Sequence, residues 1–322
     1  MTRAPYFTSL VTVGLLAALL VAGGIAYPGF LSLQVMLNLL IDNSFLLVIA
    51  IGMSFVILSG GIDLSVGSVL ALSTMVAAWL LHAAHWPPAA VMAAVLLMGV
   101  VFGAGMGALI HFFRLQPFIV TLGGMFLARG LCYLISVNSI PIEDPAFVAI
   151  SQAQVSIFDG FVSPGVVIAL ALLVLAMAVA HLTPFGRAVY AVGGNEQSAH
   201  MMGLPVGATK VAVYAISGGC AALAGLLFSF YMLSGYGLHA QGTELDAIAA
   251  VVIGGTLLTG GYGYVAGALT GVLVLGAIQT LIVFDGTLSS WWTKIVIGVL
   301  LFAFCALQRL LAWRPNPARR CS

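Results

Sequence analysis

A small set of ionisable and hydroxyl side chains lies within long apolar stretches of this sequence, and these groups could contact a polar solute. Asp63, in the segment SGGIDLSVGS, has apolar residues on both sides. Arg129 lies in another apolar stretch and is the expected electrostatic partner of Asp63, because an unpaired arginine inside a bilayer is costly. The residues that we assign to a polar pathway are Ser59, Asp63, Ser65, Arg129, Glu244 and Asp246.

The sequence contains none of the motifs that would indicate covalent catalysis, ATP hydrolysis or metal binding. A phosphate-binding loop of the GxxxxGK[ST] type needs a lysine after glycine, and both lysines, Lys210 and Lys294, follow threonine. The cysteines form no CxxC pair, and His82 and His85 have no third metal ligand nearby. We therefore expect no catalytic residue, no metal, no cofactor and no ATP hydrolysis by this chain.

The composition places the polar groups inside a membrane protein. Hydrophobic residues make up 62% of the 322 residues and charged residues 6%, whereas soluble proteins carry about 25% charged residues. The net charge is +1 and the cations are dispersed along the chain, so a nucleic-acid partner is not expected. We predict an all-α polytopic integral membrane protein in which residues 1–322 form a single transmembrane domain.

A membrane-spanning helix needs about 20 apolar residues, and the chain divides into about ten such stretches. The first is longer than the apolar core of a signal peptide, so it is expected to remain uncleaved. The stretch at 247–258 is too short to cross alone, so it either begins earlier, near Asp246, or belongs to a broken helix. The predicted spans are 7–27, 43–59, 66–84, 88–112, 118–136, 163–182, 210–232, 247–258, 264–284 and 291–311.

The basic residues orient these spans, because lysine and arginine favour the cytoplasmic side of a membrane. If both termini are cytoplasmic, most of the cations fall on the cytoplasmic side. These cations are Arg3, Arg114, Arg187, Lys210, Arg309, Arg314, Arg319 and Arg320. The acidic residues of the loops then lie outside or at the outer ends of spans.

Two glycine-rich segments predict breaks in the spanning helices. The glycine pair that begins at Gly60 permits a sharp turn, and Asp63 is the expected N-cap of a helix that starts at Leu64. The segment IGGTLLTGGYGY predicts a second break between Gly254 and Gly263. Broken helices at membrane depth are tolerated where they line a cavity, which agrees with a polar pathway near Asp63.

Two loops are longer than a turn requires. They are the outer loop, 137–162, which contains Glu143, Asp144 and Asp159, and the inner loop, 183–209. The basic tail, 312–322, is expected to contact anionic lipid head groups.

The inner loop carries the signals of a short helix. Asn195 follows two glycines and is a candidate N-cap, Gly203 is a candidate C-terminal stop, and Pro205 follows it. These signals predict a helix of about two turns over 196–202 at the membrane surface. Its two methionines suit insertion into a groove of another protein.

Glycines at helical spacing predict close contacts between spans. Gly99, Gly103 and Gly107 form two overlapping GxxxG patterns, and Gly267 and Gly271 form another. Small residues let helix backbones approach where lipid provides no hydrophobic drive for association. The spans are therefore expected to form a compact bundle.

Three segments together are similar to the signature regions of the ribose-type sugar permeases of ATP-binding cassette transporters. They are SGGIDLSVGS, residues 186–204 with the run YAVGGNEQSAHMMGL, and ELDAIAAVVIGGTLLTGG, in the same order as in that family. Within the family, the chain most resembles the permeases of the galactofuranose uptake system, in which two different permease subunits pair. Leu257, Leu258 and Thr259 differ from the family pattern, which commonly has small polar residues there.

This resemblance implies a permease subunit of a bacterial monosaccharide importer in the inner membrane. The implied partners are a sugar-type ATPase, a second permease subunit in a heterodimer or homodimer, and a periplasmic sugar-binding protein, which we expect to dock on the outer loop. The residues expected to couple to the ATPase are Gly193, Gly194, Asn195, Glu196, Ser198, Ala199, His200 and Gly203. The alternatives are an ion-coupled secondary transporter and a permease of the same superfamily for another small polar solute, such as a branched-chain amino acid or a signalling furanose.

Overall fold

The computed structural model describes residues 4–289 and 291–312, and most of this part of the chain is helical. The predicted basic tail beyond Ala312 lies outside the described residues, as do Arg3 and the last three arginines. The helices are α1 (Ala4–Ala26), α2 (Leu33–Asp42), α3 (Ser44–Leu58), α4 (Val66–His82), α5 (Pro88–Phe112), α6 (Pro117–Ile135), α7 (Pro145–Gln152), α8 (Pro164–Leu182), α9 (Pro184–Gly194), α10 (Glu196–Met201), α11 (Val206–Met232), α12 (Thr243–Ile253), α13 (Gly267–Asp285) and α14 (Trp291–Ala312).

The predicted all-helical, multi-span architecture is confirmed. Five helices are long and apolar enough to cross a membrane, namely α5, α6, α8, α11 and α13. The pair α2 and α3 adds a sixth span if the two are counted together across their 53° bend. Shorter apolar helices cover Leu10–Ala26, Val66–His82 and Trp291–Ala306.

Two details of the predicted spans were wrong. The span expected at 247–258 is α12, which begins at Thr243, in line with the earlier start near Asp246, but ends at Ile253, where the second break begins. The predicted span 43–59 left out α2, which precedes α3 and is separated from it only by Asn43.

α11 is the central helix of the bundle and packs against α5, α3 and α4. Gly99 of α5 lies against Gly218 of α11 so closely that an added methyl group would overlap the partner backbone. Gly103 and Gly107 continue this contact along α11 as far as Val211. The GxxxG patterns of α5 therefore have the predicted packing role, because each small residue admits the neighbouring backbone.

The second glycine pattern packs α13 against α12. Gly267 faces Gly254, and Gly271 faces the backbone of Ala250, again without room for a methyl group. The C-terminal half of the short helix α12 is thus held by α13, and residues 249–253 are buried.

Both predicted helix breaks are present. α3 ends at Leu58, Gly60 adopts a left-handed φ of 82°, and α4 begins only at Val66. After α12, the chain turns through several glycines with positive φ before α13 begins at Gly267. Glycine is required at such positions because a side chain is strained in left-handed backbone.

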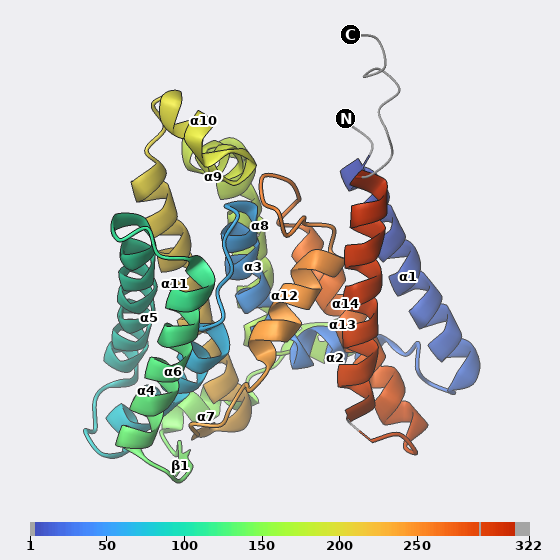
Figure 1. Ribbon diagram of the computed structural model, residues 1–322. Coiled ribbons are helices and arrows are strands. Elements are labelled where there is room, and N and C mark those ends of the chain that lie inside the picture. The colour runs from blue at the N-terminus through green and yellow to red at the C-terminus, as the bar shows by residue number, and fades with distance from the viewer. Residues whose placement is uncertain (1–3, 290, 313–322) are drawn as a thin grey trace.

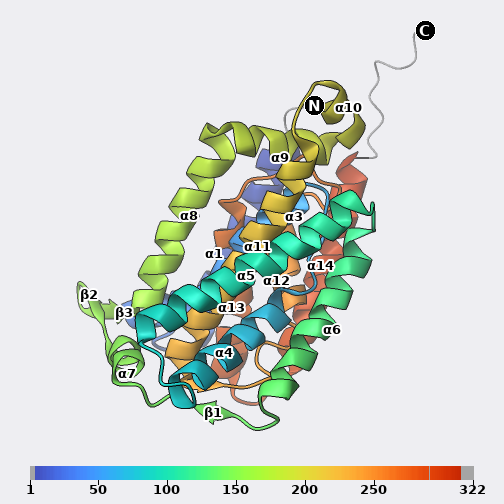
Figure 2. The same cartoon turned by 90° about the vertical axis from the view of Figure 1, so that its left-hand side faces the viewer.

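The two long loops lie at opposite ends of the bundle (Figure 1). We call the end with α9 and α10 the inner end, and the first turn of α1 and the last turn of α14 lie at the same end. The outer end carries α7 and two small antiparallel strand pairs, β1 (Ile140–Pro141) with β4 (Ser234–Gly235), and β2 (Val155–Ile157) with β3 (Gly160–Val162). Figure 2 shows α5 crossing in front of α11, with α8 along one flank and α6 along the other.

Candidate functional site

Asp63 lies in the extended segment between α3 and α4 and is fully buried. Its Oδ1 accepts hydrogen bonds from the backbone N–H and the hydroxyl of Ser65, at 2.9 and 2.6 Å. Its Oδ2 accepts a hydrogen bond from the hydroxyl of Ser217 on α11, at 2.7 Å. Buried polar groups need such partners, and Asp63 therefore ties the first break to the central helix.

The predicted role of Asp63 as an N-cap was wrong. α4 begins at Val66 with Ser65 in the N-cap position, and Asp63 instead holds the turn that precedes it. An aspartate that bonds the backbone two residues ahead favours a turn over a helix, which delays the helix start. The expected pairing of Asp63 with Arg129 is not formed either, since both side chains have other partners.

Arg129 on α6 anchors the turn between α11 and α12. Its Nη1 donates hydrogen bonds to the carbonyl oxygens of Gly237 and His239, at 2.5 and 2.7 Å. Hydrogen bonds from a charged donor are stronger than those between neutral groups. Arg129 thereby holds in place the turn that leads into α12 at the outer end of the bundle.

The remaining pathway residues have separate partners. Glu244 and Asp246 both lie in the first turn of α12, where acidic groups suit the helix dipole. Asp246 forms an ion pair with Lys294 of α14 at 2.6 Å, whereas the carboxylate of Glu244 faces Gly67 at the start of α4. Ser59 ends α3, and its hydroxyl donates to a carbonyl of the preceding turn at 2.8 Å.

The inner loop contains two helices, and only the second was predicted. α9 begins at Pro184, and the side chain of Thr183 caps it by accepting from the backbone N–H of Gly186 at 3.2 Å. A threonine followed by proline is a start signal for a helix, and it could have revealed α9. Gly193 and Gly194 therefore form the end of α9, directly before the N-cap Asn195.

α10 has the predicted start, with the side chain of Asn195 accepting from the backbone N–H of Ser198 at 2.8 Å. Met201 and Met202, beside the left-handed Gly203, are 80% and 68% exposed. Ala199, which we assigned to coupling, is fully buried in a small apolar cluster at this end of the bundle. Ala199 thus attaches α10 to the bundle, while the methionines form an exposed apolar surface.

The other predicted coupling residues differ in exposure. His200 is exposed and Ser198 is half-buried. Glu196 forms an ion pair with Lys210 of α11 at 2.7 Å, which ties α10 to the central helix.

Gly193 joins α9 to both helix breaks. A methyl group there would overlap the carbonyl oxygen of Leu58 and lie 2.6 Å from the backbone nitrogen of Gly261. These two atoms form a hydrogen bond of 2.8 Å between the end of α3 and the second break. Gly60 and Gly260 pack beside them, both with left-handed φ. We call Gly60, Gly193, Gly260 and Gly261 the glycine junction.

The residues of the site all lie within the part of the chain that matches a known protein family. Residues 35–305 match the family described as branched-chain amino acid transport system / permease component. The chain belongs to this permease family. No solved structure gives a significant match to the chain.

The named relatives of the permease include sugar importers. It is 52% identical over 284 residues to the inner membrane ABC transporter permease protein YjfF of Escherichia coli, covering 88% of this chain and 86% of YjfF. It is 39% identical to the fructose import permease protein FruG of Bifidobacterium longum, covering 94% of this chain and 90% of FruG. It is 40% identical to the ribose import permease protein RbsC of Haemophilus influenzae, covering 78% of each chain.

The permease is therefore a multi-pass inner membrane subunit of an ATP-binding cassette sugar importer and is not itself an enzyme. Membership of this family implies an ATPase and a binding protein as partners. It also decides against the alternative of an ion-coupled secondary transporter.

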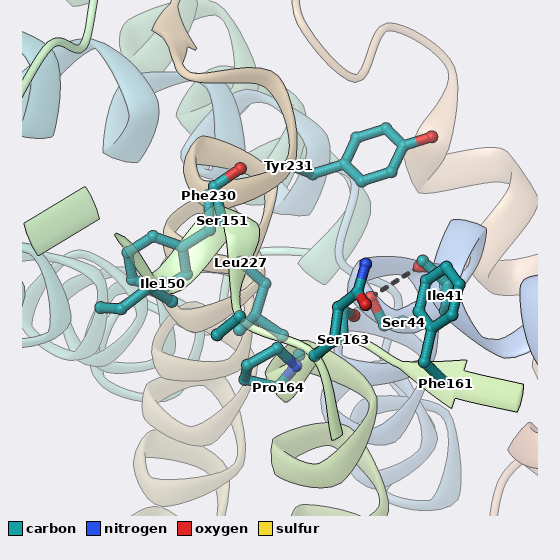
Figure 3. Close-up of a pocket in the computed structure, with 13 residues that line it drawn as sticks. Ile41, Ser44, Ile150, Ser151, Phe161, Ser163, Pro164, Leu227, Phe230 and Tyr231 are labelled. Carbon is teal, nitrogen blue, oxygen red and sulfur yellow. Dashed lines mark hydrogen bonds between the residues drawn. The ribbon is translucent and has the colours of Figure 1, made fainter. Parts of the chain in front are cut away.

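The permease has a pocket of about 270 Å³ at its outer end (Figure 3). The lining comes from the α2–α3 bend, α7, β3, the start of α8 and the end of α11. Three aromatic rings, Phe161, Phe230 and Tyr231, and the hydroxyls of Ser44 and Ser163 contribute to it. None of the predicted site residues lines this pocket, which lies between the outer loop and the outer ends of the neighbouring helices.

Ser217 is a residue of the site that was not selected from the sequence. Ser217 is a hydroxyl within an apolar helix, the same signal that selected Ser59 and Ser65. Only the packing of α11 against the first break distinguishes Ser217 from other serines, because its partner Asp63 is 154 residues away.

Proposed function

We propose that the sugar imported by this permease is galactofuranose and that the permease pairs with a second, different permease subunit. The resemblance of the three signature segments to the galactofuranose uptake system supports both parts of this proposal. The name of YjfF specifies no sugar, and other relatives are named for fructose, ribose and allose. Those sugars are therefore the competing candidates.

Ring-locked competitors test the proposed substrate. The importer is reconstituted in proteoliposomes with both permeases, the ATPase and the binding protein, and ATP-driven uptake of labelled galactose is measured. Methyl galactofuranoside should inhibit at a concentration at least about tenfold below that of methyl galactopyranoside, equivalent to roughly 1.4 kcal/mol of preference. The reverse order, or stronger inhibition by ribose, fructose or allose, contradicts the galactofuranose assignment. Uptake without the second permease contradicts the heterodimer.

The mechanism that we propose is alternating access driven from the inner end. In this proposal residues 1–322 act as one transmembrane domain, with the inner end facing the cytoplasm as the basic residues predict. The glycine junction is the observation that carries the mechanism, because it places α9 directly against both helix breaks. A movement of α9 is then transmitted to α3, α12 and the polar side chains beside them.

The ATPase is proposed to bind α9 and α10. Support comes from the exposed methionines, since flexible apolar side chains adapt well to a groove. The polar side chains of Asn195, Glu196 and His200 are exposed beside the methionines and form the rim of this surface. Ala199 and the ion pair of Glu196 with Lys210 keep α10 attached, so that a push on it reaches the bundle.

Cysteine crosslinking tests this binding surface. With Cys132, Cys220, Cys305 and Cys321 replaced, Met201→Cys should crosslink to single cysteines in the ATPase, and the yield should change when nucleotide is added. Phe158→Cys is the matched control, because Phe158 is also strongly exposed, at 93%, but lies in the outer loop. Free labelling of Met201→Cys by a water-soluble reagent in the complete importer, without any crosslink, would show that the ATPase binds elsewhere.

The binding protein is proposed to dock on the outer loop, as its length and acidic residues suggest. Glu143 and Asp159 are exposed there. Asp144 instead caps α7, since its Oδ1 accepts from the backbone N–H groups of Ala146 and Phe147 at 2.9 and 3.3 Å. Only the first two are therefore free to meet basic groups on a partner.

Charge reversal separates docking from folding. Glu143→Lys combined with Asp159→Lys should weaken the binding of the loaded binding protein, and the loss should shrink at high salt because exposed charges are screened. Affinity is measured with the importer in nanodiscs at two ionic strengths. Asp144→Asn, which retains a capping side chain, serves as a control for the structure of α7. Equal affinity of the double variant and the wild type would refute this docking site.

A further inference from the structure

A cluster of polar and aromatic side chains surrounds the turn between α11 and α12. Arg129 approaches this turn from α6, at a position closer to the outer end of that helix. The turn itself provides Tyr236 and His239, and the first turn of α12 provides Glu244. The cluster therefore joins α6, α11 and α12 in the outer half of the bundle.

Within the described residues, two polar atoms of this cluster are buried without a hydrogen bond. They are Nδ1 of His239 and Oε2 of Glu244. Gly67 of α4 lies directly against the carboxylate of Glu244, where any side chain would overlap it. Because buried polar atoms normally have partners, both atoms are suited to a ligand that can donate and accept hydrogen bonds.

Arg129 and Glu244 form no ion pair in the described part of the chain. Arg129 contacts the backbone of His239 and lies near enough to Glu244 for the two charges to interact. However, both hydrogen bonds of Arg129 go to carbonyl oxygens and come from Nη1, while Nε and Nη2 make none in the described part of the chain. A hydroxyl group can donate to the carboxylate and accept from the guanidinium at the same time.

Aromatic rings complete the cluster. The ring of His239 packs edge-on against Tyr236 at 5.6 Å and against Phe228 at 5.0 Å. Rings of this kind offer an apolar face beside a polar edge. A sugar has the matching chemistry, because its hydroxyl groups alternate with apolar C–H faces.

We infer that Arg129, His239 and Glu244 bind hydroxyl groups of the imported sugar in the outer half of the permease, with Tyr236 and Phe228 shaping the apolar side of the site. The inference deepens the proposed pathway, and it requires sugar import but not a particular sugar. Asp63 is not part of this site, since its oxygens are already occupied by Ser65 and Ser217.

Direct binding and coupling test the inference together. The importer in nanodiscs, without binding protein, is examined by saturation-transfer NMR with whichever of D-galactose, D-ribose, D-fructose or D-allose it transports fastest. The wild type should give a sugar signal, and Glu244→Gln should lose it. With binding protein and ATP, the same variant should import at least about tenfold less sugar per ATP hydrolysed, a loss of roughly 1.4 kcal/mol.

Two further variants distinguish loss of sugar binding from misfolding. His239→Phe keeps the ring packing but removes Nδ1, and it should show the same loss of signal and coupling. Gln241→Ala changes an exposed side chain of the same turn and should behave as the wild type. Wild-type signal and coupling in Glu244→Gln or His239→Phe would overturn the inference, as would import by the wild type with no sugar signal. Failure to import any of the four sugars would instead contradict sugar import itself.

Discussion

Gly193→Ala is expected to lower ATP-driven sugar uptake by about tenfold or more although the protein still inserts into the membrane. The added methyl group would occupy the space of the Leu58 carbonyl oxygen and press on the backbone nitrogen of Gly261. The hydrogen bond between those two atoms must then break or α9 must move away. Overpacking of this kind costs about 1–3 kcal/mol, and each 1.4 kcal/mol corresponds to roughly a tenfold change in an equilibrium.

The neighbouring glycine provides the control for this prediction. A methyl group on Gly194 meets no atom within 4 Å, although both glycines lie in the last turn of α9. Uptake by proteoliposomes containing Gly194→Ala should therefore stay close to that of the wild type, and ATPase activity is measured in parallel. If Gly193→Ala transports as well as Gly194→Ala, the glycine junction does not link the coupling helices to the breaks.

Asp63→Ala is expected to lower the amount of folded permease in the membrane, and with it sugar uptake. The change leaves the hydroxyls of Ser65 and Ser217 and one backbone N–H without their partner in a fully buried place. A buried donor left unsatisfied costs about 1–3 kcal/mol. Protein level and the thermal unfolding of the purified permease measure the loss.

Asp63→Asn separates hydrogen bonding from charge. The amide keeps one acceptor oxygen for Ser65, and its NH₂ group can donate to Ser217 once that hydroxyl turns round. We expect nearly normal thermal stability for this variant, because the contacts survive in a modified form.

A combined Asp63→Ala and Ser217→Ala variant should be less destabilised than the sum of the two single changes. Strict additivity would show that the two side chains do not interact.

Local patterns in the sequence were sufficient to predict the all-helical, multi-span class and the two breaks. Long apolar runs must form helices in a membrane, because only a helix satisfies its own backbone hydrogen bonds in lipid. Gly60 and the glycines between 254 and 263 were predicted as breaks because glycine alone adopts left-handed backbone without strain. The GxxxG pattern of α5 was interpreted correctly for the same local reason, namely the absence of side-chain bulk.

The errors arose where neighbouring signals competed. Asp63 was expected to cap a helix, but its carboxylate bonds Ser65 instead and the turn continues to Val66. α9 was missed because residues 183–209 were treated as a loop with one helix over 196–202, whereas the start signal at Thr183 and Pro184 favours another helix. The end of α12 was placed too late, because apolar composition continues beyond Ile253 while the glycines already turn the chain.

Composition, helical period, glycine positions and motif order thus determined the membrane class, the broken bundle and the resemblance to sugar permeases. The partners of the polar side chains were decided only by tertiary packing. The spanning helices are apolar on nearly all sides, so no polar face in the sequence indicates which residues point inward. Three contacts join segments that are distant in the sequence. Asp63 is hydrogen-bonded to Ser217, Arg129 is hydrogen-bonded to the turn before α12, and Gly193 packs against Gly261. Such contacts follow from how closely two backbones approach, and that approach is set by the whole bundle rather than by any one stretch of chain.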